Sequence, residues 1–101
     1  MEIFNSREDL RVVIRTPGAA VIDTRVTELE VEDALGRFSI VAGGDPALAA
    51  LVPSELVLRK RDGGEIRVEV SWGSLTAVGH QARIVVESAR VRYIEPMRIA
   101  V

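Results

Sequence analysis

The sequence contains no cysteine and few aromatic residues. Its 101 residues include two phenylalanines, one tyrosine and one tryptophan. The absence of cysteine excludes disulfides, thiol catalysis and thiolate metal sites, and it leaves a cytosolic setting as the default. With so few aromatic side chains, the core must be built from Val, Ile, Leu and Ala, which favours strands over an aromatic-lined ligand pocket.

Long apolar runs and a broad positive surface are also missing. The N-terminal segment MEIFNSREDLR lacks the apolar core of a signal peptide, and no uninterrupted apolar run approaches the length of a membrane span. We therefore expect any membrane association to occur through a partner. The net charge is −2, with basic residues spread along the chain, which argues against nucleic-acid binding. A chain of this length forms one domain.

Short alternating runs separated by turn residues predict an all-β fold. Asp62-Gly63-Gly64 between two alternating runs is the strongest hairpin signal in the sequence. A second hairpin is expected across residues 79–82. This spacing predicts a flattened sandwich or barrel of about 8–10 short, mostly antiparallel strands. The expected strands cover residues 10–15, 20–23, 25–32, 38–42, 47–52, 54–61, 65–71, 72–78 and 83–88.

The most informative stretch runs from Gly36 to Pro53, GRFSIVAGGDPALAALVP. Phe38 and Ile40 alternate on one face of a strand, residues 43–46 force a turn, and the next apolar strand ends at Pro53. The stretch is strongly patterned but contains no catalytic side chain. We interpret it as a docking surface.

Two irregularities limit the regular pattern. Alternation slips once between Val26 and Leu29, which predicts a bulge inside the run at residues 25–32. From Ala89 onward the pattern loosens, and Pro96 blocks the continuation of a regular element. We therefore expect a sandwich domain over residues 1–89 and a short tail, too short for a helical hairpin, over residues 90–101.

Candidate catalytic and metal-binding residues have simpler interpretations. His80, the only histidine, lies in a Gly-His-Gln turn with no predicted nucleophile nearby, so we interpret it as an exposed turn residue. The acidic series Glu28, Glu30, Glu32 and Asp33 spreads along a strand instead of converging on a cation, as a solvated face does. We predict no catalytic residue, no cofactor and no metal.

Other polar or exposed features leave alternatives open. Gly43-Gly44-Asp45 lacks the lysine and the helix of a phosphate-binding loop. The basic residues 59–61 either solubilise a hairpin tip or contact a partner. Trp72 fits a core position or an exposed protein-binding anchor equally well. Ser71, Ser74 and Thr76 have no base at motif spacing, so an enzyme is the minority hypothesis.

In order and in register, these residues resemble the amino-terminal sandwich domain of the epsilon subunit of F-type rotary ATP synthases, called delta in mitochondria. The resemblance covers about residues 10–89. Residues 13–17 (VIRTP) are similar to the opening strand and turn of the family. The 36–53 stretch falls without a gap on the family pattern G-x-F-G-I-L-P-G-H-A-P-L-L-x-A-L-x-P-G. Further matches are Arg61-Asp62-Gly63 in the hairpin, Val70-Ser71 with Gly73 in the V-S-G-G turn, and Glu87-Ser88-Ala89 in the closing A-D/E-S-A.

The departures from the family pattern gather in the loop that faces the membrane ring in the family. The P-G-H of the family is Ala42-Gly43-Gly44 here, and Arg37 and Ser39 replace its acidic residue and its glycine on either side of Phe38. The second glycine of its V-S-G-G turn is Trp72. Such changes suit a divergent, second-copy ATPase of the sodium type with its own ring.

The resemblance implies a non-catalytic central-stalk subunit that couples ion translocation to ATP synthesis or hydrolysis at the cytoplasmic face of a bacterial inner membrane. It implies a rotor position between the gamma subunit and the c-ring. The chain stops where the inhibitory hairpin of longer members begins, so it is expected neither to bind ATP nor to inhibit hydrolysis. The implied c-ring contacts are Arg37, Phe38, Gly43, Gly44, Asp45 and Pro46, and the implied gamma contacts are Leu48, Ala49 and Trp72.

An alternative function is a free-standing sandwich adaptor that binds a protein through Trp72 or an exposed edge strand. A small enzyme is the third possibility. The adaptor and the rotor subunit share a fold, so the surface of the molecule must distinguish them.

Overall fold

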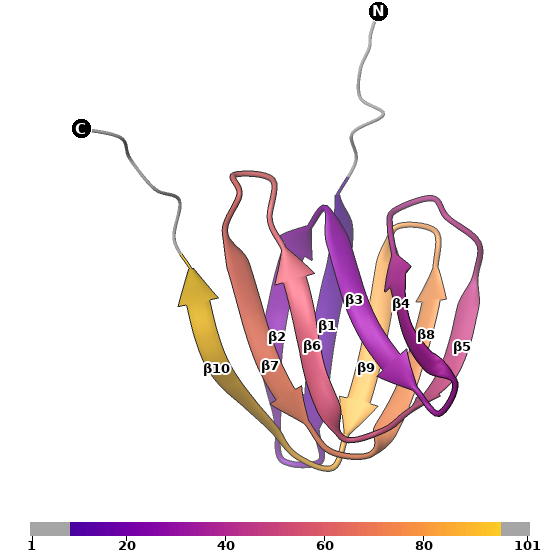
Figure 1. Cartoon of the computed structure of the whole chain (residues 1–101), viewed down its shortest axis with the longest axis vertical. Helices are drawn as coiled ribbons and strands as arrows, with labels where there is room; N and C mark the ends of the chain where they lie inside the picture. The colour runs from indigo at the N-terminus through magenta and orange to yellow at the C-terminus, as the bar shows by residue number, and fades with distance from the viewer. Residues whose placement is uncertain (1–8, 96–101) are drawn as a thin grey trace, which may run out of the picture.

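In a computed structural model that describes residues 9–95, the chain forms ten β-strands and no helix within that range (Figure 1). The predicted all-β class is therefore confirmed. The strands are β1 (Leu10–Thr16), β2 (Ala19–Val26), β3 (Glu28–Asp33), β4 (Gly36–Ile40), β5 (Ala47–Leu51), β6 (Ser54–Arg59), β7 (Glu65–Val70), β8 (Gly73–Val78), β9 (Gln81–Val86) and β10 (Ala89–Glu95).

One continuous sheet folds over into two layers. Its strand order is β10-β7-β6-β3-β5-β8-β9-β1-β2, and β4 pairs with β3. Figure 1 shows β10, β7, β6, β3 and β4 in front, which we call the front layer, and β5, β8, β9, β1 and β2 behind them, which we call the back layer. The layers are joined at a single β3–β5 residue pair, Asp33 with Leu51. All pairings are antiparallel except that between β1 and β9.

The core lies between the layers and consists of aliphatic side chains. Every second residue of a strand points inward, so Val12 and Ile14 from the back layer meet Leu56 and Leu58 from the front layer, all fully buried. Each such side chain contributes about 1.5–3 kcal/mol on burial. No polar or charged side chain within the described range is fully buried. The sandwich is therefore stabilised by hydrophobic packing, and its polar residues lie outside.

Turn chemistry predicted the local hairpins correctly. β6 and β7 pair in antiparallel register around residues 60–64, where the Asp62 carboxylate accepts the Gly64 N–H at 2.8 Å. Gly63 has a φ of 93°, a left-handed conformation that glycine adopts without steric cost. The predicted strand, turn and strand of the 36–53 stretch are confirmed as β4, a loop and β5.

The predicted bulge between Val26 and Leu29 is wrong. β2 ends at Val26 and β3 begins at Glu28, because the chain leaves the back layer at Thr27 and enters the front layer. The Thr27 N–H and hydroxyl both donate to the Arg59 carbonyl, at 2.7 and 2.9 Å. The slip in alternation marks a change of layer, and the register shifts lie in the β1–β2 and β10–β7 pairings.

Two other boundaries differ from the sequence expectation. The β8–β9 turn is shorter than residues 79–82, because Gln81 already pairs with Val78 and leaves only Gly79 and the exposed His80 in the turn. The sheet also extends beyond residue 89, since β10 pairs with β7 as far as Glu95. A register shift in this pairing disturbs the alternation, which explains why the strand was missed. The rest of the predicted tail, residues 96–101, lies outside the described residues.

Within the described range the structure contains no helical segment with the length and hydrophobicity that a membrane crossing requires.

Candidate functional site

The outer face of the front layer carries a network of ion pairs. Arg37 of β4 lies between two glutamates of β3: its Nε donates to Glu30 Oε2 at 2.7 Å and its Nη1 to Glu32 Oε1 at 3.0 Å. Its Nη2 donates to the Glu55 carbonyl of β6 at 2.9 Å. All the donor nitrogens of this guanidinium are therefore used within its own layer.

The same network continues across β6 and β7. Arg59 lies 3.1 Å from Glu30 and 3.3 Å from Glu65, and Arg67 lies 2.9 Å from Glu65 and 3.0 Å from Glu55. Alternating strand residues place acids and arginines side by side, so the glutamates of β3 pair with arginines. Among the residues that the structure describes, no group of three or more acidic or histidine side chains could hold a metal ion.

Charge pairing shifts the protonation equilibria of this face. The hydrogen bond from Arg37 holds the pKa of Glu30 below its usual value, although partial burial opposes the shift. The hydrogen bond from Arg90 likewise lowers the pKa of Glu69. Glu30 and Glu69 therefore stay charged at neutral pH, and each is paired with an arginine of its own layer.

Val57 shows how completely this network covers the layer. It points outward from β6, opposite Glu30 on one side and Arg67 on the other. It is nevertheless only 4% exposed. The aliphatic stems of long charged side chains can cover apolar surface while their charged ends stay in water, which accounts for this burial.

The outer face of the back layer is different. Leu48 is 83% exposed and Val85 is 52% exposed, and the outward side chain of Val78 is also exposed. Strand pairing arranges these residues in rows across the layer. One row runs Leu48, Thr76, Arg83 and Val13, and the next runs Ala50, Ser74, Val85 and Arg15.

The three residues implied as gamma contacts do not share one environment. Leu48 lies on the back outer face, but Ala49 is partly buried, packs against the core and pairs with the fully buried Leu75. Its neighbour Ala50 is the exposed residue. Trp72 is 59% exposed just before β8, where its carbonyl accepts the Glu87 N–H at 3.1 Å. Of the two interpretations left open for Trp72, the structure supports the exposed position.

The six residues implied as c-ring contacts lie at two ends of the molecule. Arg37 is near the start of β4, whereas Gly43 to Pro46 follow the end of that strand (Figure 1). The Gly43 N–H donates to the Gly79 carbonyl at 2.8 Å, which fixes the β4–β5 loop beside the β8–β9 turn. Phe38 lies between the two ends and packs against the core.

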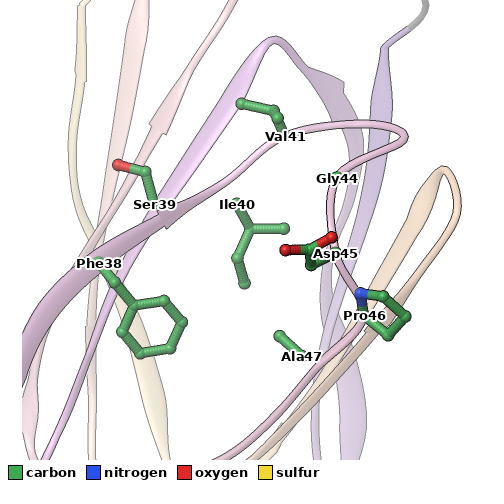
Figure 2. A pocket seen from close by; sticks show the side chains of 8 residues that line it. All are labelled: Phe38, Ser39, Ile40, Val41, Gly44, Asp45, Pro46 and Ala47. Carbon is green, nitrogen blue, oxygen red and sulfur yellow. The ribbon is translucent and has the colours of Figure 1, made fainter.

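An open hollow of about 340 Å³ lies between β4 and the β4–β5 loop. Figure 2 shows Phe38 and Ile40 lining it from β4, with Asp45 and Pro46 on the loop opposite. Asp45 is the only charged residue of its lining, and no nucleophile and base are paired there. The residues that line the hollow are therefore mainly apolar and backbone-rich, with one carboxylate at its border.

Sequence reasoning missed Leu35, which is 96% exposed in the β3–β4 turn. The Asp33 carboxylate accepts the N–H groups of Leu35 and Gly36, at 2.8 and 3.2 Å, and so braces the turn. Asp and Gly three residues apart are a typical turn pattern. That pattern was present in the sequence, but it does not reveal that the side chain between them is fully exposed.

Comparison with known proteins assigns the sandwich domain to a protein family. The model of the β-sandwich domain of the ATP synthase delta/epsilon chain matches residues 9–92. The chain belongs to the ATP synthase delta/epsilon family. An ATP synthase epsilon chain from Geotalea uraniireducens is 33% identical over 82 residues, which cover 81% of this chain and 59% of the relative. An epsilon chain 2 from Syntrophotalea carbinolica is 28% identical over 86 residues, 84% of this chain and 61% of the relative.

Solved structures share the fold of this chain. A chain of the Euglena gracilis mitochondrial ATP synthase superposes with a TM-score of 0.78 at 14% identity, over 82% of this chain and 53% of its own length. A chain of the Tetrahymena thermophila mitochondrial ATP synthase central stalk and c-ring structure superposes with a TM-score of 0.67 at 15% identity. The match covers 83% of this chain and 67% of that chain. The resemblance to the epsilon sandwich is thus confirmed. This delta/epsilon chain spans about three fifths of the length of the curated relatives it matches.

Proposed function

We propose that the chain is a non-catalytic rotor subunit in the central stalk of an F-type ATP synthase, at the cytoplasmic face of a bacterial inner membrane. It couples movement of the membrane ring to nucleotide chemistry by contacting both the gamma subunit and the ring. Membership of the delta/epsilon family supports this role, as do solved structures of the same fold within ATP synthase assemblies. One relative is named epsilon chain 2, which fits a second-copy ATPase. Densely packed sandwich interiors transmit strain, which suits torque transfer.

The contact with gamma is assigned to the back outer face. The single observation that carries it is the contrast between the faces: the front outer face pairs its own charges, whereas the back one exposes Leu48, Val78 and Val85. Exposed apolar side chains in neighbouring rows are typical of protein interfaces. The front face would gain little from a partner because its charges are already satisfied.

The contact with the ring is assigned to the end that carries the β3–β4 turn. Leu35 projects there from a braced turn, and Trp72 lies at the same end, because Asp33, Leu51 and Gly73 occupy one row of paired residues. The Gly43 to Pro46 loop lies at the opposite end of β4 and points away from the ring in this arrangement. The proposal therefore separates Arg37, near the end assigned to the ring, from Gly43, Gly44, Asp45 and Pro46 at the opposite end.

Binding to the gamma subunit of the same genome tests the first contact. We expect the wild-type chain to co-purify with gamma, and Leu48→Asp to weaken binding about tenfold or more because it places a charge in an apolar interface. Leu35→Asp is the matched control, because Leu35 is an even more exposed leucine that lies outside that face, and it should bind like the wild type. A wild-type chain that fails to bind gamma contradicts the rotor role and favours the adaptor.

Single-cysteine crosslinking tests the second contact, and the natural absence of cysteine makes the labelling clean. Leu35→Cys and Asp45→Cys place the probe at the two ends of the molecule. In the assembled complex we expect a crosslink to the ring from position 35 and none from position 45. The reverse result assigns the ring to the Gly43 to Pro46 loop, and no crosslink from either contradicts the ring contact.

A further inference from the structure

The arginines of the two outer faces differ in their ion pairing. On the front outer face, Arg37, Arg59, Arg67 and Arg90 each lie within ion-pair distance of at least one glutamate. In the back layer, the described residues form one comparable pair, between Arg11 and Asp23.

Arg83 and Arg15 of the back outer face form no ion pair with any side chain that the structure describes. They lie diagonally across the parallel β9–β1 pairing, with Val85 and Val13 on the other diagonal. Glu87, the exposed carboxylate just beyond β9, is joined to neither of them. Within the described residues, both arginines therefore lack an ion pair, and the neighbouring Val85 is exposed.

A shallow hollow of about 160 Å³ lies beside Arg83. It is lined by two facing residue pairs of the β8–β9 hairpin, Thr76 with Arg83 and Val78 with Gln81. The volume is several times the roughly 30 Å³ that one water molecule occupies in the liquid. It is large enough for an aliphatic side chain, and Arg83 is one of the four residues that line it.

Burial of this face by a partner would remove Arg83 from water. An unpaired cation at an interface carries a large desolvation cost unless an acceptor replaces the lost hydration. The apolar residues Leu48 and Val13 lie in the same row as Arg83 and favour a partner that covers the face closely. The row ends at Asp23 of β2, whose carboxylate is paired with Arg11. A partner that binds here must therefore bring its own carboxylate.

We propose that the gamma subunit places an acidic side chain against Arg83 and an adjacent aliphatic side chain in the hollow between Thr76 and Val78. This inference rests on the proposed function, which names gamma as the partner. The chemistry required is a carboxylate next to an apolar residue on the gamma surface. Arg15, diagonal to Arg83, extends the same positive site toward β1.

The test measures the dissociation constant of gamma for the wild-type chain and for Arg83→Ala, Arg83→Lys and Arg83→Glu, at low and at high salt. We expect Arg83→Ala to bind about 10-fold to 100-fold more weakly and to lose part of the salt dependence, and Arg83→Lys to retain part of the affinity. Arg90→Ala is the matched control, an exposed arginine of the front layer that pairs with Glu69, and should change binding less than about twofold.

A charge exchange locates the acidic partner directly. Aspartates and glutamates of gamma are changed to lysine one at a time, and one of these variants should restore binding to Arg83→Glu. Thermal melting checks that each variant is folded, which is expected because Arg83 is exposed and makes no ion pair among the described side chains.

The outcomes separate this inference from the proposed function. If the wild type binds gamma and Arg83→Ala binds with the same affinity and salt dependence, the inference is wrong and the rotor role stands. If no acidic position of gamma restores binding to Arg83→Glu, direct pairing is wrong. If the wild type does not bind gamma, both are wrong.

Discussion

The two outer faces of the sandwich are built by the same alternation of strand residues, but their charges are arranged differently. On the front outer face, Arg37 and Arg59 are surrounded by glutamates of the same layer. On the back outer face, Arg83 lies among exposed aliphatic residues without a partner in the described part of the chain. The proposed gamma-binding face is thus the one whose arginines lack ion pairs within the described residues, and the face that carries more ion pairs is assigned no partner.

The largest expected effect is on stability, from a substitution at Gly73 in the back layer. A Cβ at this position would lie 2.2 Å from the Val85 carbonyl oxygen and 2.5 Å from Val86 Cγ1. Backbone cannot yield as a flexible side chain does, so Gly73→Ala should destabilise the fold by about 3 kcal/mol or more. Chemical denaturation measures this free energy. Gly18→Ala is the control and should be nearly neutral, because no heavy atom lies within 4 Å of the added Cβ. Equal denaturation midpoints for the two variants would show that β8 and β9 do not approach so closely.

A smaller effect compares two outward valines, one on each face. Val57 is covered by the ion-pair network, so Val57→Ala should cost about 2 kcal/mol from lost burial and an unfilled cavity. Val85 is exposed, so Val85→Ala should cost less than about 0.5 kcal/mol but weaken gamma binding. Chemical denaturation measures the free energy of unfolding of both variants, and a binding assay measures their affinity for gamma. The contrast between the faces is lost if the two stability changes are alike.

The smallest effect concerns pH. Because Arg37 lowers the pKa of folded Glu30, this carboxylate contributes stability above its unfolded pKa and loses that contribution as the pH falls through its folded pKa. Glu30→Gln should therefore be about 1 kcal/mol or less below the wild type at pH 7, and the gap should close below about pH 4. Asp45→Asn is the matched control, because it removes a carboxylate that has no ion pair among the described side chains. A gap for Glu30→Gln that is constant with pH would argue against the network.

Local features of the fold were predictable because they depend on neighbouring residues. The Asp62-Gly63 turn required glycine at a left-handed position, and the two strands around it alternate clearly. The family pattern over residues 36–53 was likewise readable without a structure. The change of layer at Thr27 was read as a bulge because both produce the same slip in alternation.

The site was less predictable because it depends on which residues of each strand point outward and on how strands distant in sequence pair. The run at residues 47–51, ALAAL, has no polar residue to mark its outward side, so Leu48 and Ala49 could not be separated until pairing with β8 directed Ala49 inward. Arg37 was expected at an interface, but β3 supplies two glutamates that bind it. Arg83 could not be singled out from the sequence, because its proposed role depends on its having no ion pair among the described side chains.

The parallel pairing of β1 with β9 has a consequence for synthesis. The two strands are hydrogen-bonded neighbours although Val13 and its partner Arg83 lie at opposite ends of the described chain. As the ribosome releases the chain from its N-terminus, β1 must wait for nearly all the other strands before this pairing can form. The front-layer hairpins β3–β4 and β6–β7 can form earlier, because their strands are adjacent in sequence. The back outer face is therefore complete only after β9 has been released, so a translation product that is interrupted before β9 lacks the surface that carries Arg83.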